Sequence, residues 1–207
     1  MGITIFYGGT LKNLNDIDTL IDDFSDLAGI MNWECVILNE DWTKPNTARI
    51  KISKMKSEIT GHLPLKGLEI KLHPACETFD LFFDNKGNLT SPLLFAFDNE
   101  EKKKKDKSFV WVKTQFAPVD IHISIIKLLD LLKHKYVPDL EVMDEGGYWE
   151  SRDRAKLIKK MDYLNKAMDI VEQALSSLSA DEMMNRPVED LARLIEEHMK
   201  KKPGITD

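Results

Sequence analysis

A strand-helix-strand pattern between residues 108 and 143 restricts the fold of this chain more than any other feature of its sequence. The runs SFVWVKTQF and LEVM are rich in the β-branched and apolar residues that are typical of strands. Between them, Pro118 suits the first turn of a helix and Pro138 ends it. The apolar residues of this helix recur at helical spacing: Ile121, Ile125, Leu128, Leu129, Leu132 and Tyr136. Because such crossovers join parallel strands, the C-terminal ends of both runs should lie at one edge of a sheet.

The first forty residues show a second pattern of the same type. ITIFY is a β-branched and aromatic run that ends at Gly8-Gly9, and WECVILN is a similar run further along. Asn15 and Asp16 suit the N-terminus of a helix between them. Its apolar residues again repeat at helical steps: Ile17, Leu20, Ile21, Phe24, Leu27, Ala28 and Met31. The chain is therefore predicted to open with a β-α-β unit.

The middle of the chain has the features of antiparallel strands. LEIKLH alternates apolar and polar residues, which is typical of a strand buried on one face, and FDLFFDNKGNL indicates a hairpin with its turn at 85–88. LLFAF and SFVWVKTQF flank the charged segment around Lys102–Lys105, so they are predicted to pair. RIKIS is a brief strand-like run within the polar segment 41–66. Together these elements predict an α+β fold with a mainly antiparallel sheet, β-α-β units at each end and helices on one face.

The C-terminal segment, from residue 151 onward, has a helical pattern. Its apolar residues alternate steps of four and three, which indicates a seam that packs on another helix: Leu157, Met161, Leu164, Met168, Val171, Leu175 and Leu178. A final amphipathic helix follows Pro187. The prediction is a helical hairpin in which residues 151–207 pack on a mixed sheet domain of residues 1–150 as part of one domain. The alternative is that the seam pairs two copies of the chain as a homodimer.

The charge of the chain is acidic and dispersed. It has 29 Lys and Arg residues against 35 Asp and Glu residues, a formal net charge of −6. This argues against nucleic acid as a partner, because nucleic-acid binding requires a concentrated basic surface. The Lys102–Lys105 run lies between acids and is interpreted as a solvated loop. No run approaches the roughly 20 apolar residues of a membrane helix, and no signal peptide is recognisable at the start. With two cysteines, Cys35 and Cys76, a cytoplasmic protein with reduced thiols is expected.

The segment HPACE contains a candidate for half of a metal site. His73 and Cys76 are spaced like two zinc ligands, and Glu77 adds a carboxylate. A further ligand would have to come from elsewhere, for example from His122 or Asp144. The simpler interpretation is a turn after a strand. A nucleophilic Cys76 with His122 as its base is a weaker alternative.

The segment DEGGYWESRD places two carboxylates beside two aromatic residues. In a purely structural interpretation, Asp144 and Glu145 end a strand, the glycines turn the chain and Ser151 caps the long helix. Exchanging both acids for amides would then change stability by no more than about 1 kcal/mol. In a functional interpretation, the adjacent carboxylates bind a cation or ligand, and Tyr148 and Trp149 form an amphipathic wall beside it.

The predicted crossover makes a crevice at this position. If the two strands are parallel, the residues after the first strand should lie near those after the second, where such sheets often bind ligands. The candidate catalytic residues are Asp144, Glu145 and His122. The candidate ligand-binding residues are Gln115, Asp120, Tyr148 and Trp149.

The sequence favours a cytoplasmic binding or interaction module whose partner is a protein or a small molecule, with neither nucleic acid nor membrane as a partner. It contains none of the specific phosphate, dinucleotide, nucleophile-elbow or zinc-protease signatures, and it indicates no particular cofactor. The alternative function is a small metal-assisted hydrolase that uses the acidic and histidine residues of the crevice. An acidic inhibitor of a basic protein would also fit the net charge.

Overall fold

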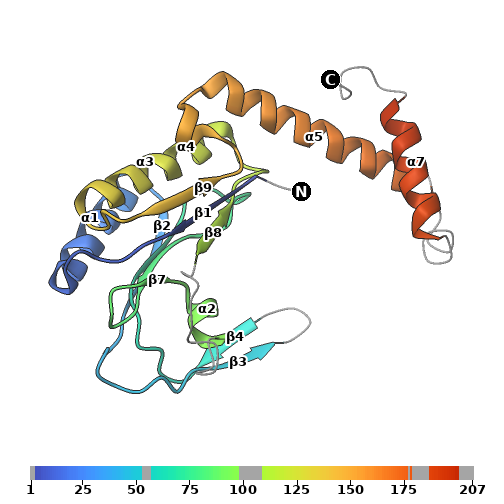
Figure 1. Ribbon diagram of the computed structural model, residues 1–207. Coiled ribbons are helices and arrows are strands. Elements are labelled where there is room, and N and C mark those ends of the chain that lie inside the picture. Colours follow the sequence, from blue (N-terminus) through green and yellow to red (C-terminus); the bar gives the residue numbers. More distant parts are fainter. Residues whose placement is uncertain (1–2, 53–56, 98–108, 177, 179–186, 201–207) are drawn as a thin grey trace. The chain divides into compact units, whose positions relative to one another are not determined.

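The computed structural model describes residues 3–52, 57–97, 109–176, 178 and 187–200 (Figure 1). The chain forms two compact units, Met1–Arg152 and Asp153–Asp207. The first unit contains antiparallel sheets with helices, and the second unit is helical. The predicted α+β fold class is confirmed. The Lys102–Lys105 loop lies outside the described residues.

A three-stranded sheet positions the candidate site. Its strands are β1 (Thr4–Gly8), β8 (Val110–Lys113) and β9 (Glu141–Asp144), in the order β8-β1-β9 (Figure 1). β1 runs antiparallel to both neighbours, so β8 and β9 are parallel to each other. Helix α3 (Val119–Lys135) connects them. The predicted crossover is confirmed, with the difference that β1 is inserted between its two strands.

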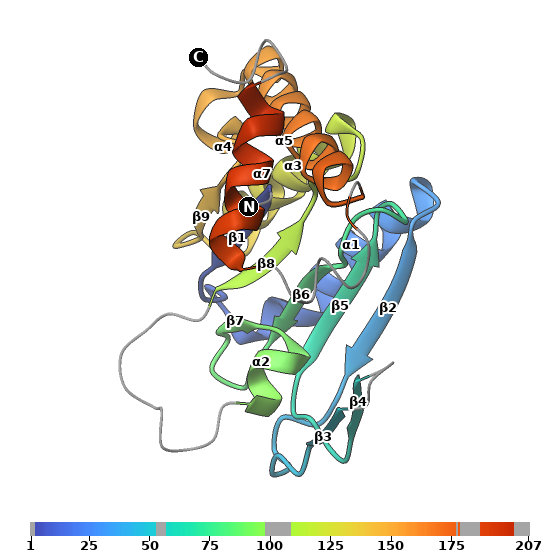
Figure 2. The same cartoon turned by 90° about the vertical axis from the view of Figure 1, so that its right-hand side faces the viewer.

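A four-stranded antiparallel sheet lies beside the first. Its order is β2 (Glu34–Asn39), β5 (Lys66–Lys71), β6 (Phe79–Phe83) and β7 (Leu89–Thr90), with β2 at one edge (Figure 2). The predicted hairpin is present as β6 and β7. Because β1 and β2 belong to different sheets, α1 (Ile17–Ile30), preceded by the 3-10 turn η1 (Leu14–Asp16), connects two sheets and not two parallel neighbours.

The main core joins the two sheets with α1 and α3. Buried side chains include Ile5 of β1, Phe24 of α1, Leu68 of β5 and Ile125 of α3. The Tyr7 hydroxyl donates to the Asp80 carbonyl oxygen at 2.9 Å and accepts from the Asp80 amide at 3.1 Å. This pair of bonds links β1 to β6. The helical and strand periodicities of the sequence therefore correspond to one shared apolar interior.

The expected strand LLFAF is wrong, because Pro92–Phe97 forms helix α2. Ser91 precedes it, and its hydroxyl accepts from the Leu94 amide at 3.2 Å. Ser before Pro is a helix start, with a capping hydroxyl followed by a residue whose φ is preset. The uncertain strand-like run in 41–66 is β3 (Arg49–Ile52), which pairs with β4 (Ser57–Thr60).

The second unit contains α5 (Arg154–Ser176) and α7 (Val188–Lys200), which pack on each other as the predicted hairpin. Asp153, and not Ser151, caps α5, because its Oδ1 accepts from the Ala155 amide at 2.9 Å. Ser151 instead ends the short helix α4 (Tyr148–Ser151) of the first unit. The assignment of both units to one domain stays a prediction.

Candidate functional site

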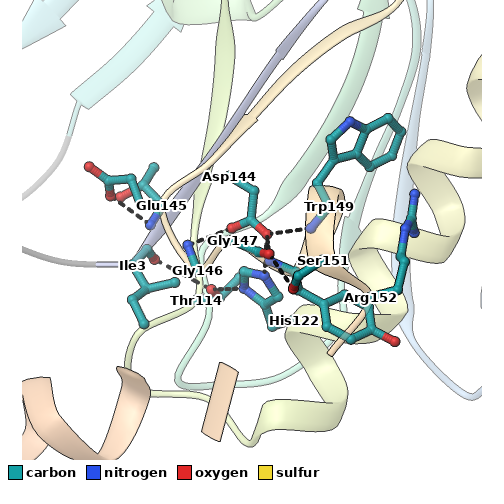
Figure 3. A network of polar contacts seen from close by, with 12 residues as sticks. Ile3, Thr114, His122, Asp144, Glu145, Gly146, Gly147, Trp149, Ser151 and Arg152 are labelled. Atoms are coloured by element: carbon teal, nitrogen blue, oxygen red, sulfur yellow. Dashed lines mark hydrogen bonds and ion pairs between the residues drawn. The ribbon is translucent and has the colours of Figure 1, made fainter. Parts of the chain in front are cut away.

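The crossover brings together three polar side chains. They come from the C-terminal ends of β8 and β9 and from the first turn of α3. His122, in the first turn of α3, lies 2.8 Å from the Thr114 hydroxyl through Nδ1 and 3.2 Å from Asp144 Oδ2 through Nε2 (Figure 3). Thr114 and His122 are fully buried, and the Asp144 side chain is 0% exposed. The predicted proximity of His122 and Asp144 is confirmed. We call Thr114, His122 and Asp144 the buried triad.

The Thr114 hydroxyl also lies 3.4 Å from the carbonyl oxygen of Ile3, to which it can donate. Two proton arrangements fit these distances. A neutral ring with its proton on Nε2 donates to Asp144 and accepts from Thr114 at Nδ1. A doubly protonated ring donates at both nitrogens, and Thr114 then donates to Ile3. In both arrangements every polar atom of the His122 ring is used within the protein.

Asp144 connects β9 to helix α4. Its Oδ1 accepts from the Gly146 amide at 2.6 Å, and its Oδ2 accepts from the amides of Tyr148 and Trp149 at 2.7 and 2.9 Å. Burial acts to raise the pKa of Asp144, but the hydrogen bond and charge of His122 and the backbone amides outweigh it and lower the pKa below its ordinary value. The carboxylate is thus ionised at neutral pH and fully engaged as a structural acceptor.

Glu145 does not join the buried triad. Its Oε2 accepts from the Thr4 amide at 2.9 Å, and its own amide donates to the Thr4 carbonyl oxygen at 3.1 Å (Figure 3). Successive side chains along an extended backbone point to opposite faces, so adjacent acids in sequence separate in space. Asp144 and Glu145 thus accept hydrogen bonds from different parts of the backbone, and a catalytic role for Glu145 stays a prediction.

Tyr148 and Trp149 are partly buried against the main core. Two cations lie near the Trp149 ring, with the Arg152 guanidinium 4.8 Å and the Lys133 ammonium 5.8 Å from its centre. Arg152 also forms a bidentate ion pair with Asp130 of α3, at 2.7 and 2.8 Å. Trp149 and Arg152 therefore connect the α4 segment to α3, through Lys133 and Asp130. A hollow of about 410 Å³ is found elsewhere, lined by residues that include Asn39, Trp42 and Lys66.

The other two crevice candidates differ in their surroundings. Gln115 is 1% exposed, and neither its Nε2 nor its Oε1 has a hydrogen-bond partner within the described part of the chain. Asp120 is exposed at the start of α3, and its carbonyl oxygen accepts from the Ser124 hydroxyl at 2.7 Å. A ligand-binding role for either residue stays a prediction.

The HPACE segment is a structural turn. The His73 Nδ1 accepts from the Ala75 amide at 3.1 Å, while Glu77 Oε2 accepts from the Lys113 amide at 2.8 Å. Cys76 is buried, and burial raises the pKa of its thiol to about 11, with Glu77 raising it further and Lys71 opposing. Such a thiol is neutral at pH 7, which disfavours the nucleophile hypothesis. Over the described residues, no group of three or more His, Cys, Asp or Glu side chains could hold a metal ion.

Comparison of the chain with protein-family models, with curated proteins and with solved structures found no match. Among the described helices, none is long and apolar enough to cross a membrane. Function must therefore be inferred from the chemistry of the chain's own surfaces.

Strand β2 carries exposed apolar residues that no chemical motif of the sequence indicates. Val36 is 58% exposed and Ile37 is 50% exposed, although they are consecutive residues of a strand and point to opposite faces. Within the described residues β2 is bonded to β5 alone, so its other side is an open edge. The signal in the sequence is the apolar run CVIL, which predicts the second strand of the β-α-β opening but not its place at the edge of a sheet.

The direction of the free backbone groups of β2 follows from its pairing with β5. The Glu40 amide donates to the Leu65 carbonyl oxygen at 3.1 Å, which makes these opposed residues a hydrogen-bonded pair. Because such pairs alternate along antiparallel strands, the even-numbered residues of β2 bond to β5. The N–H and C=O groups of Cys35, Ile37 and Asn39 therefore point away from the sheet.

Proposed function

We propose that this chain is a non-catalytic protein-interaction module that binds an extended segment of its partner along the open edge of β2. The observation that carries the proposal is the combination of outward backbone groups with two half-exposed apolar side chains, Val36 and Ile37. Strand addition uses these elements, with backbone hydrogen bonds for affinity and alternate side chains for specificity.

Among the described residues, the edge of β2 lacks most of the usual protection against pairing. Edge strands are commonly protected by lysine, proline, bulges or short length. β2 has six residues, ECVILN, with a continuous register against β5, and Glu34 is its one charged residue. Glu34 also lies opposite Lys71 of β5, which balances its charge. An edge of this type favours pairing with another strand.

The edges of the other sheet are shorter and partly occupied. β8 and β9 have four residues each. Glu77 occupies the outward backbone groups of Lys113 on β8. Its carboxylate accepts from the Lys113 amide at 2.8 Å, and its own amide donates to the Lys113 carbonyl oxygen at 3.1 Å. On β9, the Asp144 carbonyl oxygen accepts from the Gly147 amide at 2.9 Å. These contacts make β2 the better candidate for strand addition.

The alternative function, a metal-assisted hydrolase, has less support. Asp144, which would be its main acid, has both oxygens engaged with His122 and with backbone amides, and its side chain is 0% exposed. The order Asp-His-Thr has the hydrogen-bond pattern of a nucleophilic triad. However, Thr114 is fully buried, so a substrate would not reach its hydroxyl in this conformation.

The proposal is tested by placing a photoreactive amino acid at Ile37 in one variant and at Met143 of β9 in another. The two positions are matched, because both lie on edge strands and are 50% and 52% exposed. We expect a protein adduct of defined mass from position 37 in cells of the source organism and none from position 143. Equal labelling of both positions, or adducts at neither, would refute an interaction through β2.

A further inference from the structure

We infer that the strand which β2 binds is β2 of a second copy of this chain, antiparallel to the first, with Val36 opposite Val36 of the second copy. This inference rests on the proposed function and names its partner. It differs from a dimer formed by the C-terminal helices, because it uses the edge of the four-stranded sheet.

The outward backbone groups restrict the register. Cys35, Ile37 and Asn39 carry these groups, so an odd-numbered residue of one copy must face an odd-numbered residue of the other. With Val36 opposite itself, Cys35 of each copy exchanges backbone hydrogen bonds with Ile37 of the other. The apolar pairs then lie on opposite faces of the joined sheet, with the Val36–Val36 pair on one face and the two Cys35–Ile37 pairs on the other.

The two neighbouring registers are less favourable. With Ile37 opposite itself, Glu34 would lie opposite Glu40 of the second copy, and directly opposed like charges are destabilising. With Cys35 opposite itself, Ile37 would face Trp33, whose amide already donates to the Ala28 carbonyl oxygen at 2.9 Å. The register centred on Val36 places Glu34 opposite Leu38 and moves Trp33 to the ends of the pairing, opposite Asn39. The central hydrogen bonds between Cys35 and Ile37 then do not need the Trp33 amide. The strand is therefore complementary to itself.

The expected affinity is low. A pair of six-residue strands buries less area than the roughly 1,200 Å² of a standard stable interface, so the dissociation constant should be on the order of micromolar. Each copy has a net charge of −6, so the copies repel each other at a distance. Salt screens this repulsion. Dimerisation should therefore strengthen when the salt concentration rises, in contrast to an interface held by opposite charges.

The register is tested by disulfide crosslinking of full-length chain. In a Cys35→Ser background, Val36→Cys should give a disulfide-linked dimer under mild oxidation, because opposed residues of a non-hydrogen-bonded pair have Cβ atoms about 4.5–5.5 Å apart. Two matched controls are Met143→Cys, which is similarly exposed, and Leu38→Cys, which would face Glu34. Both should stay monomeric on a non-reducing gel. Crosslinking of Leu38→Cys as strongly as Val36→Cys would overturn the register.

Sedimentation velocity tests the surface independently of new cysteines. The wild-type chain should shift from monomer to dimer over a range of about 1–100 micromolar, and Ile37→Lys should remain monomeric with an unchanged circular dichroism spectrum. A dimer that persists in Ile37→Lys uses another surface and overturns the inference. A wild-type monomer at all concentrations, with no Val36→Cys crosslink, also overturns it. The proposed function survives that result if the photoreactive residue at 37 captures a different protein and Val36→Lys abolishes the capture.

Discussion

The buried triad and the open edge of β2 use polar groups in opposite ways. At the triad, Asp144 accepts hydrogen bonds from His122 and from the amides of α4, and its side chain is 0% exposed. At β2, backbone donors and acceptors point outward beside Val36 and Ile37, which are 58% and 50% exposed. The region with catalytic residue types is closed, and the region with ordinary apolar residues is open.

The comparison shows that residue type alone is a poor guide to a site. A carboxylate or imidazole inside a protein must be hydrogen-bonded, because an unpaired buried polar group costs several kcal/mol. His122 and Asp144 therefore serve each other and the backbone. An edge strand carries donors and acceptors in every residue, whatever its side chains are. Its capacity to bind comes from topology, which decides whether a neighbouring strand is present.

The largest expected effect tests whether the triad is structural. Asp144→Ala leaves His122 and the amides of Tyr148 and Trp149 without their acceptor, so we expect the free energy of unfolding to fall by roughly 3–5 kcal/mol. Urea denaturation at pH 7 measures it. Glu145→Ala is the matched control, with an expected loss of no more than about 1 kcal/mol. If Asp144→Ala is as stable as the control, the triad is free for another role.

The second prediction concerns Asp80 of β6, a partly buried carboxylate with the opposite environment. Its Oδ1 has no partner among the described residues, and burial, with smaller contributions from Glu69 and Glu77 against a hydrogen bond from Thr78, raises its pKa from 3.8 to about 6. Because the pKa is raised in the folded protein, the stability contributed by protonated Asp80 is fully present below about pH 4. It is lost as the pH rises through about 6, where the folded carboxyl group ionises. Asp80→Asn should stabilise the fold by up to about 3 kcal/mol at pH 8.

The control for Asp80→Asn is the pH itself. At pH 4 the wild-type carboxyl group is largely protonated and resembles the amide, so the two proteins should have nearly equal denaturation midpoints. A stabilisation that is the same at pH 4 and pH 8 would show that ionisation is not its cause.

The third prediction uses the acid side of the Asp144 titration. The pKa of Asp144 is lowered from 3.8 in the folded protein, so its contribution to stability is present above pH 4 and is lost as the pH falls through the lower folded value. The difference in unfolding free energy between wild type and Asp144→Asn should therefore narrow below pH 4. A difference that stays constant down to pH 2 would assign the effect to packing instead of charge.

The smallest stability effect is expected at the open edge. Ile37→Thr keeps a β-branched residue and removes apolar surface that is half exposed, so we expect a change within about 0.5 kcal/mol. Hydrogen exchange of the dilute wild type gives a sharper test. The amides of Val36 and Leu38 should be protected, while those of Ile37 and Asn39 should exchange rapidly and become protected as concentration rises. Uniform protection in the dilute protein would mean that the edge is already covered.

The helices and strands, and part of the site's geometry, could be predicted from local pattern. The 3.6-residue repeat located α1 and α3, alternation located β5, and the DNKGN turn predicted the β6–β7 hairpin. The crossover rule placed the end of β8 beside the end of β9, which predicted the contact between His122 and Asp144. Helix α2 was missed because the apolar run after Ser91 was interpreted without its Ser-Pro start.

The amino-acid sequence by itself determined the periodicities, the turns and the direction of the crossover, because these depend on residues close together along the chain. Only the tertiary structure decided that β1 lies between β8 and β9 and that β2 is an edge of a separate sheet. It also decided that the Asp144 carboxylate is buried against amides of α4. Strand order and burial depend on contacts between residues that are distant along the chain. The energy that decides between alternatives is summed over many such contacts in the core, so no short segment reveals it. Local pattern therefore identified the polar residues, while the long-range packing determined which groups are enclosed and which backbone edge is left open.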